Sequence, residues 1–144
     1  MRRIIRSIVL CTVIFAGFSL SLAAQDMSKE EEKAEKEFYE SVEREIDRLT
    51  SLLKLEDWQV FYVDSILTHD YKAMQDEFAA MSAAKMTNSD LFYDVQDKWM
   101  EQIYQSLHKI LDNKQWAMYE KTGAARDKKA RDKRAAKKNT KPGK

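Results

Sequence analysis

Residues that punctuate turns or form cross-links are scarce, because the 144-residue chain has one cysteine, one proline and three glycines. A fold with many strands needs more turn residues than these. Two of the glycines and the proline also lie close to the C-terminus, at Gly123, Pro142 and Gly143. The sequence therefore predicts an all-α protein made of long helices.

The N-terminus has the composition of a secretory signal peptide. Arg2, Arg3 and Arg6 precede or flank a mostly apolar, uncharged run over residues 8–22, which ends in small residues at Ala24. The order basic, apolar, small is typical of a cleaved leader. A membrane anchor is the alternative, but the run is shorter than the roughly 20 residues that span a bilayer. We expect cleavage after Ala24.

Cys11 argues against a lipoprotein leader, because it follows the bulky Leu10 and lies early in the apolar run. Cleavage after Ala24 removes this cysteine, so the mature chain can form neither a disulfide nor a thiolate metal site. The predicted organisation is a signal peptide over residues 1–24, a helical domain over 25–123 and a basic, disordered tail over 124–144.

Apolar residues spaced three and four apart predict four helices. Their expected bounds are residues 28–53, 57–84, 90–111 and 113–121. The second helix is apolar around most of its first half, because Trp58, Phe61 and Tyr62 fall outside its main apolar stripe. One partner helix cannot cover such a surface. Asn88 or Ser89 is expected to cap the third helix, and Gly123 suits a helix C-terminus.

Charge is divided along the chain. Residues 25–125 hold 12 Lys or Arg against 22 Asp or Glu, whereas residues 126–144 hold 10 against 2. Apart from Pro142, this tail has no apolar residue larger than alanine, which predicts a solvated arm, partly helical or disordered. Its candidate partners are anionic envelope surfaces, acidic clients or the acidic first helix, and a purely solubilising tail is the alternative. Export makes nucleic acid an unexpected partner.

The sequence contains no recognisable catalytic motif. It has two histidines, His69 and His108, and no His-x3-His pair, glycine-rich phosphate loop or serine elbow. Asp70 follows His69, but the two are expected to face different ways on a helix. We predict that the protein is not an enzyme and needs no cofactor. A metal site that involves the two histidines remains an alternative.

A five-residue pattern occurs twice, as Leu55-Glu56-Asp57-Trp58-Gln59 and as Leu111-Asp112-Asn113-Lys114-Gln115. Each copy lies where one predicted helix ends and the next begins. The leucine can enter the core, the acid can cap the next helix, and the glutamine can reach back to a free backbone N–H. In the first copy, Asp57 is an alternative to Glu56 as the cap. Two unrelated helix caps are the alternative, but two copies 56 residues apart, each at a predicted helix joint, argue against coincidence.

These two segments resemble the LTxxQ-like motifs of the Spy/CpxP family of small periplasmic helical proteins. Glu56 and Asp112 stand in the threonine position, and the resemblance extends over about residues 38–122. It implies an antiparallel helical hairpin of about four helices that forms a cradle-shaped homodimer. It also implies a periplasmic, ATP-independent chaperone (holdase) or envelope-stress protein that binds unfolded clients.

The aromatic and methionine content points towards binding as well. A thin hairpin cannot bury so many large apolar side chains, so the surplus contacts a second subunit or a client. The candidate contact residues are Trp58, Phe61, Tyr62, Phe92, Trp99 and Trp116. Each of them can equally be part of the core. The alternative functions are an interaction or sensor module with one dedicated envelope partner, or a metal-responsive sensor.

Overall fold

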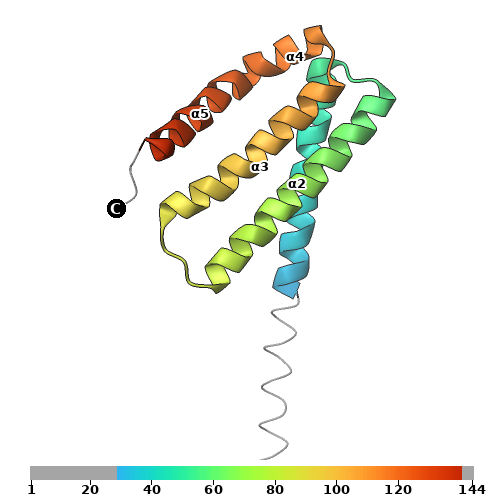
Figure 1. The fold of residues 1–144 in the computed structure, drawn as a ribbon. Coiled ribbons are helices and arrows are strands. Elements are labelled where there is room, and N and C mark those ends of the chain that lie inside the picture. The colour runs from blue at the N-terminus through green and yellow to red at the C-terminus, as the bar shows by residue number, and fades with distance from the viewer. Residues whose placement is uncertain (1–28, 141–144) are drawn as a thin grey trace, which may run out of the picture. The chain divides into compact units, whose positions relative to one another are not determined.

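The structure, a computed structural model, describes residues 29–140, and these form helices joined by short turns (Figure 1). The chain divides into two compact units between Glu40 and Ser41. A first helix covers residues 29–53, and the following elements are α2 (Asp57–Ala83), α3 (Ser89–Ile110), α4 (Asn113–Tyr119), a π-helical turn (Glu120–Ala124) and α5 (Ala125–Asn139). The predicted all-α class is confirmed. The leader and its cleavage site lie outside the described residues.

Residues 29–40 are the polar beginning of the first helix. Nearly all of their side chains are exposed, and lysines pair with glutamates one turn later, as in Lys33–Glu37 at 3.8 Å. Phe38 and Tyr39 meet edge to face with ring centroids 5.2 Å apart. The lysine–glutamate pairs, which are four residues apart on an exposed helix, stabilise it by only about a few tenths of a kcal/mol each.

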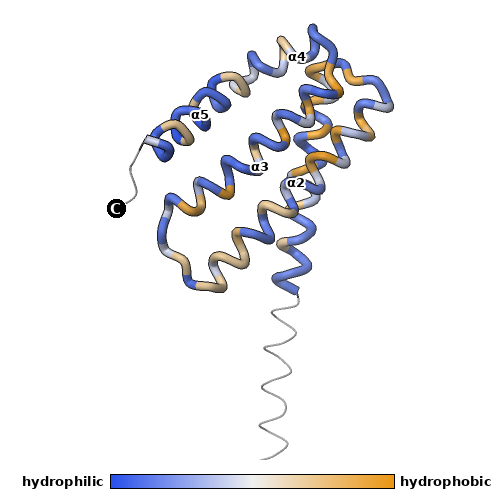
Figure 2. Tube along the Cα trace, viewed as in Figure 1, coloured by the Kyte–Doolittle hydropathy of each residue, from blue (hydrophilic) through white to orange (hydrophobic). Residues whose placement is uncertain are grey.

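The core of the second unit is built from apolar stripes on three helices and from Leu111. Its buried members are Val42, Ile46, Leu49 and Leu53 of the first helix, Val63, Leu67 and Met81 of α2, and Val95, Ile103 and Leu107 of α3. Within each helix these positions mostly recur at helical spacing, as the sequence predicted. In Figure 2 the most hydrophobic residues gather towards the α4 end of α2 and α3, and α5 is largely hydrophilic.

Helices α2 and α3 lie side by side and form an antiparallel hairpin (Figure 1). The turn between them begins with Lys85 in the left-handed backbone region at φ 53°, and the Met86 N–H donates to the Met81 carbonyl at 3.0 Å. This arrangement satisfies a free carbonyl at the end of α2. Asn88 then caps α3 as predicted, because its side chain accepts a hydrogen bond from the Asp90 N–H.

Gly123 lies at a joint between two helices. Its φ of +112° is a conformation that side chains disfavour, so glycine suits this position. The prediction that a helix ends near Gly123 holds for α4, but α5 begins at once, at Ala125. Helix α5 then runs back along α3, which lies between α2 and α5 in Figure 1.

Of the two states predicted for the tail, partly helical or disordered, the helical one is found at residues 125–139, which form α5. The tail lacks large apolar side chains, as the sequence showed, and it packs instead through charge. Arg134 donates two hydrogen bonds to Asp97, at 2.6 and 2.5 Å, and Arg131 donates two to Glu101, at 3.3 and 3.2 Å. The partner of the tail is therefore α3. A composition-based reading of the tail alone could not reveal this, because the matching acids lie about 35 residues earlier.

Candidate functional site

The two repeated motifs meet in space through their glutamines. The Gln59 side-chain N–H donates to the Gln115 Oε1 at 2.7 Å, and the Gln115 N–H donates back to the Gln59 Oε1 at 2.9 Å. Both residues are buried, with 3% and 8% of their surface exposed. Buried amides are stable only when they are hydrogen-bonded, and these two satisfy each other. We call Gln59 and Gln115 the glutamine pair.

Each glutamine also bonds to the backbone at its own helix start. The Gln59 Oε1 accepts from the Glu56 N–H at 2.9 Å, and the Gln115 Oε1 accepts from the Asp112 N–H at 3.0 Å. The backward hydrogen bond that the motif predicts is therefore present in both copies. In addition, the Gln59 side chain donates to the Ile110 carbonyl at 2.9 Å. It therefore gives a hydrogen-bond partner to a free carbonyl at the end of α3 as well as to a free N–H at the start of α2.

The acidic residues of both motifs form capping boxes with the glutamine three residues later, but the strongest hydrogen bonds of the two carboxylates differ. The Asp112 carboxylate accepts hydrogen bonds from the N–H groups of Lys114 and Gln115, at 2.7 and 2.8 Å. Glu56, and not Asp57, is the first residue before α2, and its carboxylate accepts a hydrogen bond from the Trp58 indole at 2.7 Å. The longer glutamate side chain thus holds an exposed aromatic ring in place.

Three of the predicted contact residues form one exposed group at the start of α2. Trp58, Phe61 and Tyr62 keep 50%, 69% and 49% of their surface exposed. Their rings meet edge to face, with centroids 6.2 Å apart for Trp58–Tyr62 and 5.6 Å apart for Phe61–Tyr62. We call these three residues the aromatic cluster. Large apolar side chains that are exposed together typically mark an interaction surface.

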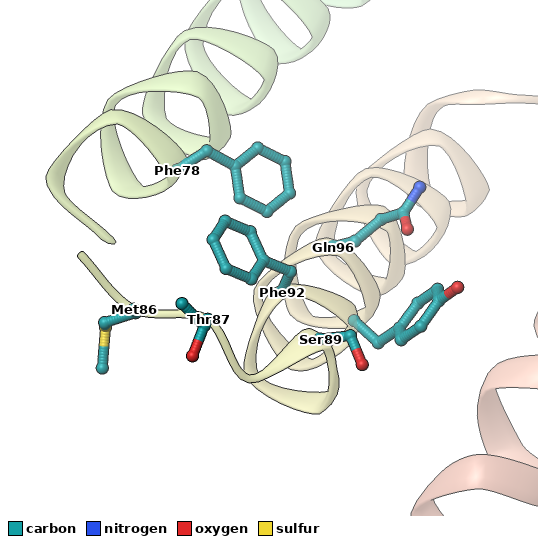
Figure 3. Close-up of a pocket in the computed structure, with 7 residues that line it drawn as sticks. Phe78, Met86, Thr87, Ser89, Phe92 and Gln96 are labelled. Atoms are coloured by element: carbon teal, nitrogen blue, oxygen red, sulfur yellow. The ribbon is translucent and has the colours of Figure 1, made fainter. Parts of the chain in front are cut away.

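The other three predicted contact residues are partly buried inside the fold. Phe92 stacks on Phe78 at 5.8 Å near the turn between α2 and α3, where the two rings face each other beside a hollow of about 390 Å³ (Figure 3). The Trp99 indole donates to the Glu77 carboxylate at 2.8 Å and so links α3 to α2. A hydrogen bond from Lys98 and, to a smaller extent, the one from Trp99 lower the pKa of Glu77.

Trp116 belongs to a second group of rings, which lies directly after the second motif. Its ring centroid is 4.8 Å from that of Tyr104 and 5.4 Å from that of Tyr119. The His108 ring is 4.3 Å away. Burial raises the pKa of Tyr119 to about 12. The rings of Tyr104, Trp116 and Tyr119 are half-buried, whereas His108 is exposed. These rings pack α4 against α3 and leave Trp116 only partly accessible.

The histidines have ordinary contacts. His69 and Asp70 face different ways, as predicted, since their side chains are 72% and 5% exposed, but the His69 Nδ1 still lies 2.8 Å from the Asp70 Oδ1. Adjacent helical side chains diverge, but an imidazole that lies along the helix surface can still reach the next carboxylate. Gln102 donates to the same Asp70 oxygen at 2.8 Å from α3. Among the described residues, no group of three or more His, Cys, Asp or Glu side chains could hold a metal ion.

Searches of family models, of curated proteins and of solved structures found no match to this chain. Within residues 29–140, none of the helices is both long enough and apolar enough to cross a membrane. The candidate site therefore stands on its own geometry, as two joined helix starts with an exposed aromatic cluster beside one of them.

Proposed function

We propose that this protein is an ATP-independent chaperone (holdase) or envelope-stress protein that binds unfolded clients in the periplasm. The observation that carries the proposal is the aromatic cluster, Trp58, Phe61 and Tyr62, which is exposed at the start of α2. The secretory character of the N-terminus supports a location where unfolded proteins occur without ATP.

The cluster has the physical properties that a holdase needs. Aromatic rings offer large apolar areas at a low cost in side-chain entropy, and they accept many apolar partners. The Trp58 indole is held by Glu56, and the α2 backbone beneath the cluster is fixed by the glutamine pair. Client segments therefore meet a surface that is already ordered, so little conformational entropy is lost on the chaperone side.

A homodimer is part of the proposal, as the family resemblance implies. An exposed aromatic surface can be covered by a second copy or by a client, and the two uses compete for the same rings. Sedimentation of the protein alone gives its mass, and sedimentation with a denatured client shows whether the dimer separates as the client binds.

The test is light scattering of a client protein as it unfolds and aggregates, with and without this protein and without ATP. The protein is purified from cells that express the full chain. We expect it to suppress aggregation at a severalfold molar excess. The double variant Phe61→Ser/Tyr62→Ser should lose most of the suppression, because it removes two of the three exposed rings.

A matched control is Met86→Ser/Leu91→Ser, which removes two other exposed apolar side chains at the far end of the α2–α3 hairpin. It should keep the suppression. If the unaltered protein fails to suppress aggregation but captures one envelope protein in a pull-down, the dedicated interaction module replaces the chaperone. Equal losses in both double variants would show that the cluster is not the client site.

A further inference from the structure

Helix α5 has two cationic faces, and only one of them is neutralised within the fold. The inner face is directed at α3, where Arg131 pairs with Glu101 and Arg134 with Asp97. Lys138 pairs with Asp94 farther along the same two helices. The three pairs show that α5 runs antiparallel to α3, because the residue numbers of the α5 partners rise while those of the α3 partners fall. This face already has its partner.

The outer face carries Lys129, Lys133 and Lys137, which we call the lysine stripe. The three side chains are exposed and are spaced four residues apart, so they follow one side of the helix at intervals of about 6 Å. In the described part of the chain, neither an ion pair nor a hydrogen bond involves any of their ammonium groups. The acids of α5 bond to other cations, Asp127 to Arg126 and Asp132 to Lys128.

We propose that the lysine stripe of α5 binds the surface of an anionic phospholipid bilayer. The charges match, because three cations in line on a straight helix can all approach one negatively charged plane. Helix α5 contains no apolar residue larger than alanine, so it would lie on the headgroups without inserting into the hydrocarbon. This site is separate from the aromatic cluster and does not depend on client binding.

The distribution of arginine and lysine favours a lipid surface over a nucleic acid. Arginine forms the two-pronged hydrogen bonds that recognise individual phosphates, whereas lysine acts as a point charge. Arg131 and Arg134 are turned towards α3, and both lie over tyrosine rings there. The outer face presents lysines without an aromatic ring on which a base could stack. Diffuse attraction to a charged membrane needs only such lysines.

The expected strength follows from the number of lysines. Each lysine near an anionic membrane strengthens binding about fivefold at low salt, so the stripe should contribute about a hundredfold. Because the attraction is purely electrostatic, it should fall steeply as salt is added.

The test is co-sedimentation of the protein, purified from cells that express and process the full chain, with vesicles that contain about 30% phosphatidylglycerol, compared with vesicles of phosphatidylcholine alone. The variant Lys129→Gln/Lys133→Gln/Lys137→Gln should bind the anionic vesicles about a hundredfold more weakly. Its helix content and suppression of client aggregation should not change, which separates this proposal from the chaperone function.

A matched control is Lys109→Gln/Lys114→Gln/Lys121→Gln, which lowers the net charge equally at exposed lysines outside α5. It should retain nearly all of the vesicle binding. The proposal is overturned if the unaltered protein does not prefer anionic vesicles, or if both triple variants lose binding equally. It is also overturned if the stripe variant loses binding to duplex DNA while its vesicle binding stays unchanged, because the stripe would then serve a nucleic acid.

Discussion

The two helix joints, residues 55–59 and 111–115, share the positions of their leucine, acid and glutamine but differ in the aromatic residues that follow them. After the first joint, Phe61 and Tyr62 remain exposed to solvent. After the second, Trp116 and Tyr119 pack with Tyr104 into a ring cluster. The same local motif is therefore followed by packed rings in one copy and by exposed rings in the other.

This difference separates the role of the motif residues from the role of the aromatic residues that follow them. The glutamine pair bonds both joints to each other and to the backbone, and this role is common to the two copies. At the first joint Phe61 and Tyr62 stay exposed, so we expect this joint to depend less on its rings. The second joint uses its rings to hold α4 against α3. Four predictions test this comparison, in order of expected effect.

The largest effect should come from the glutamine pair, which is shared by both joints. Gln59→Ala should lower the free energy of unfolding by about 3 kcal/mol, because it leaves buried backbone and amide groups without partners. Gln115→Ala should cost a similar amount, and the double variant should cost less than the sum of the two. Chemical denaturation measures all three, with the exposed Gln75→Ala as control.

The next effect concerns the aromatic residues, where the joints should behave differently. Trp116→Ala should cost about 2 to 3 kcal/mol of stability, because it removes packing against Tyr104 and Tyr119. Phe61→Ala should change stability by less than about 0.5 kcal/mol, because its ring is mostly exposed. Thermal unfolding of the two variants gives the comparison. Equal losses would mean that the first joint also depends on its rings.

The pH dependence of stability should reveal the half-buried Tyr119 in the ring cluster of the second joint. The pKa of Tyr119 is raised to about 12 by burial, so the folded state keeps its proton after the unfolded chain has lost it near pH 10. The resulting stabilisation is complete below pH 10 and is lost as the pH rises through 12, by about 2 kcal/mol. The stability of Tyr119→Phe should fall less over this range, as measured by denaturant titrations at each pH.

The smallest effect should distinguish the two acids. Asp112→Ala should cost about 1 kcal/mol, because its carboxylate caps two backbone N–H groups of α4. Glu56→Ala should cost less, about 0.5 kcal/mol, since Glu56 belongs to a capping box but its carboxylate bonds mainly to the exposed Trp58 indole. In an NMR spectrum of the indole N–H groups, the Trp58 signal should shift in Glu56→Ala and stay unchanged in Asp112→Ala, because only Glu56 accepts from that group. A larger loss of stability in Glu56→Ala would show that both acids are structural caps.

Much of the fold could be predicted because helices leave strong local signals. Apolar spacing located the helices, Asn88 marked the start of α3, and Gly123 marked the break before α5. The repeated motif also predicted that each glutamine bonds back to its own helix start. All of these features are decided within a few residues along the chain, where sequence and structure are directly connected.

Contacts between segments that are far apart in the sequence could not be predicted from these local signals. The sequence alone determined that the chain is helical, that two similar joints interrupt it and that its C-terminal segment is cationic. Only the tertiary structure decided that Gln59 and Gln115 bond to each other, that Trp116 is packed while Phe61 is exposed, and that α5 lies along α3. The reason is physical: backbone preference and capping act between neighbours, whereas the burial of a ring or the pairing of a charge depends on which remote helix packs against it.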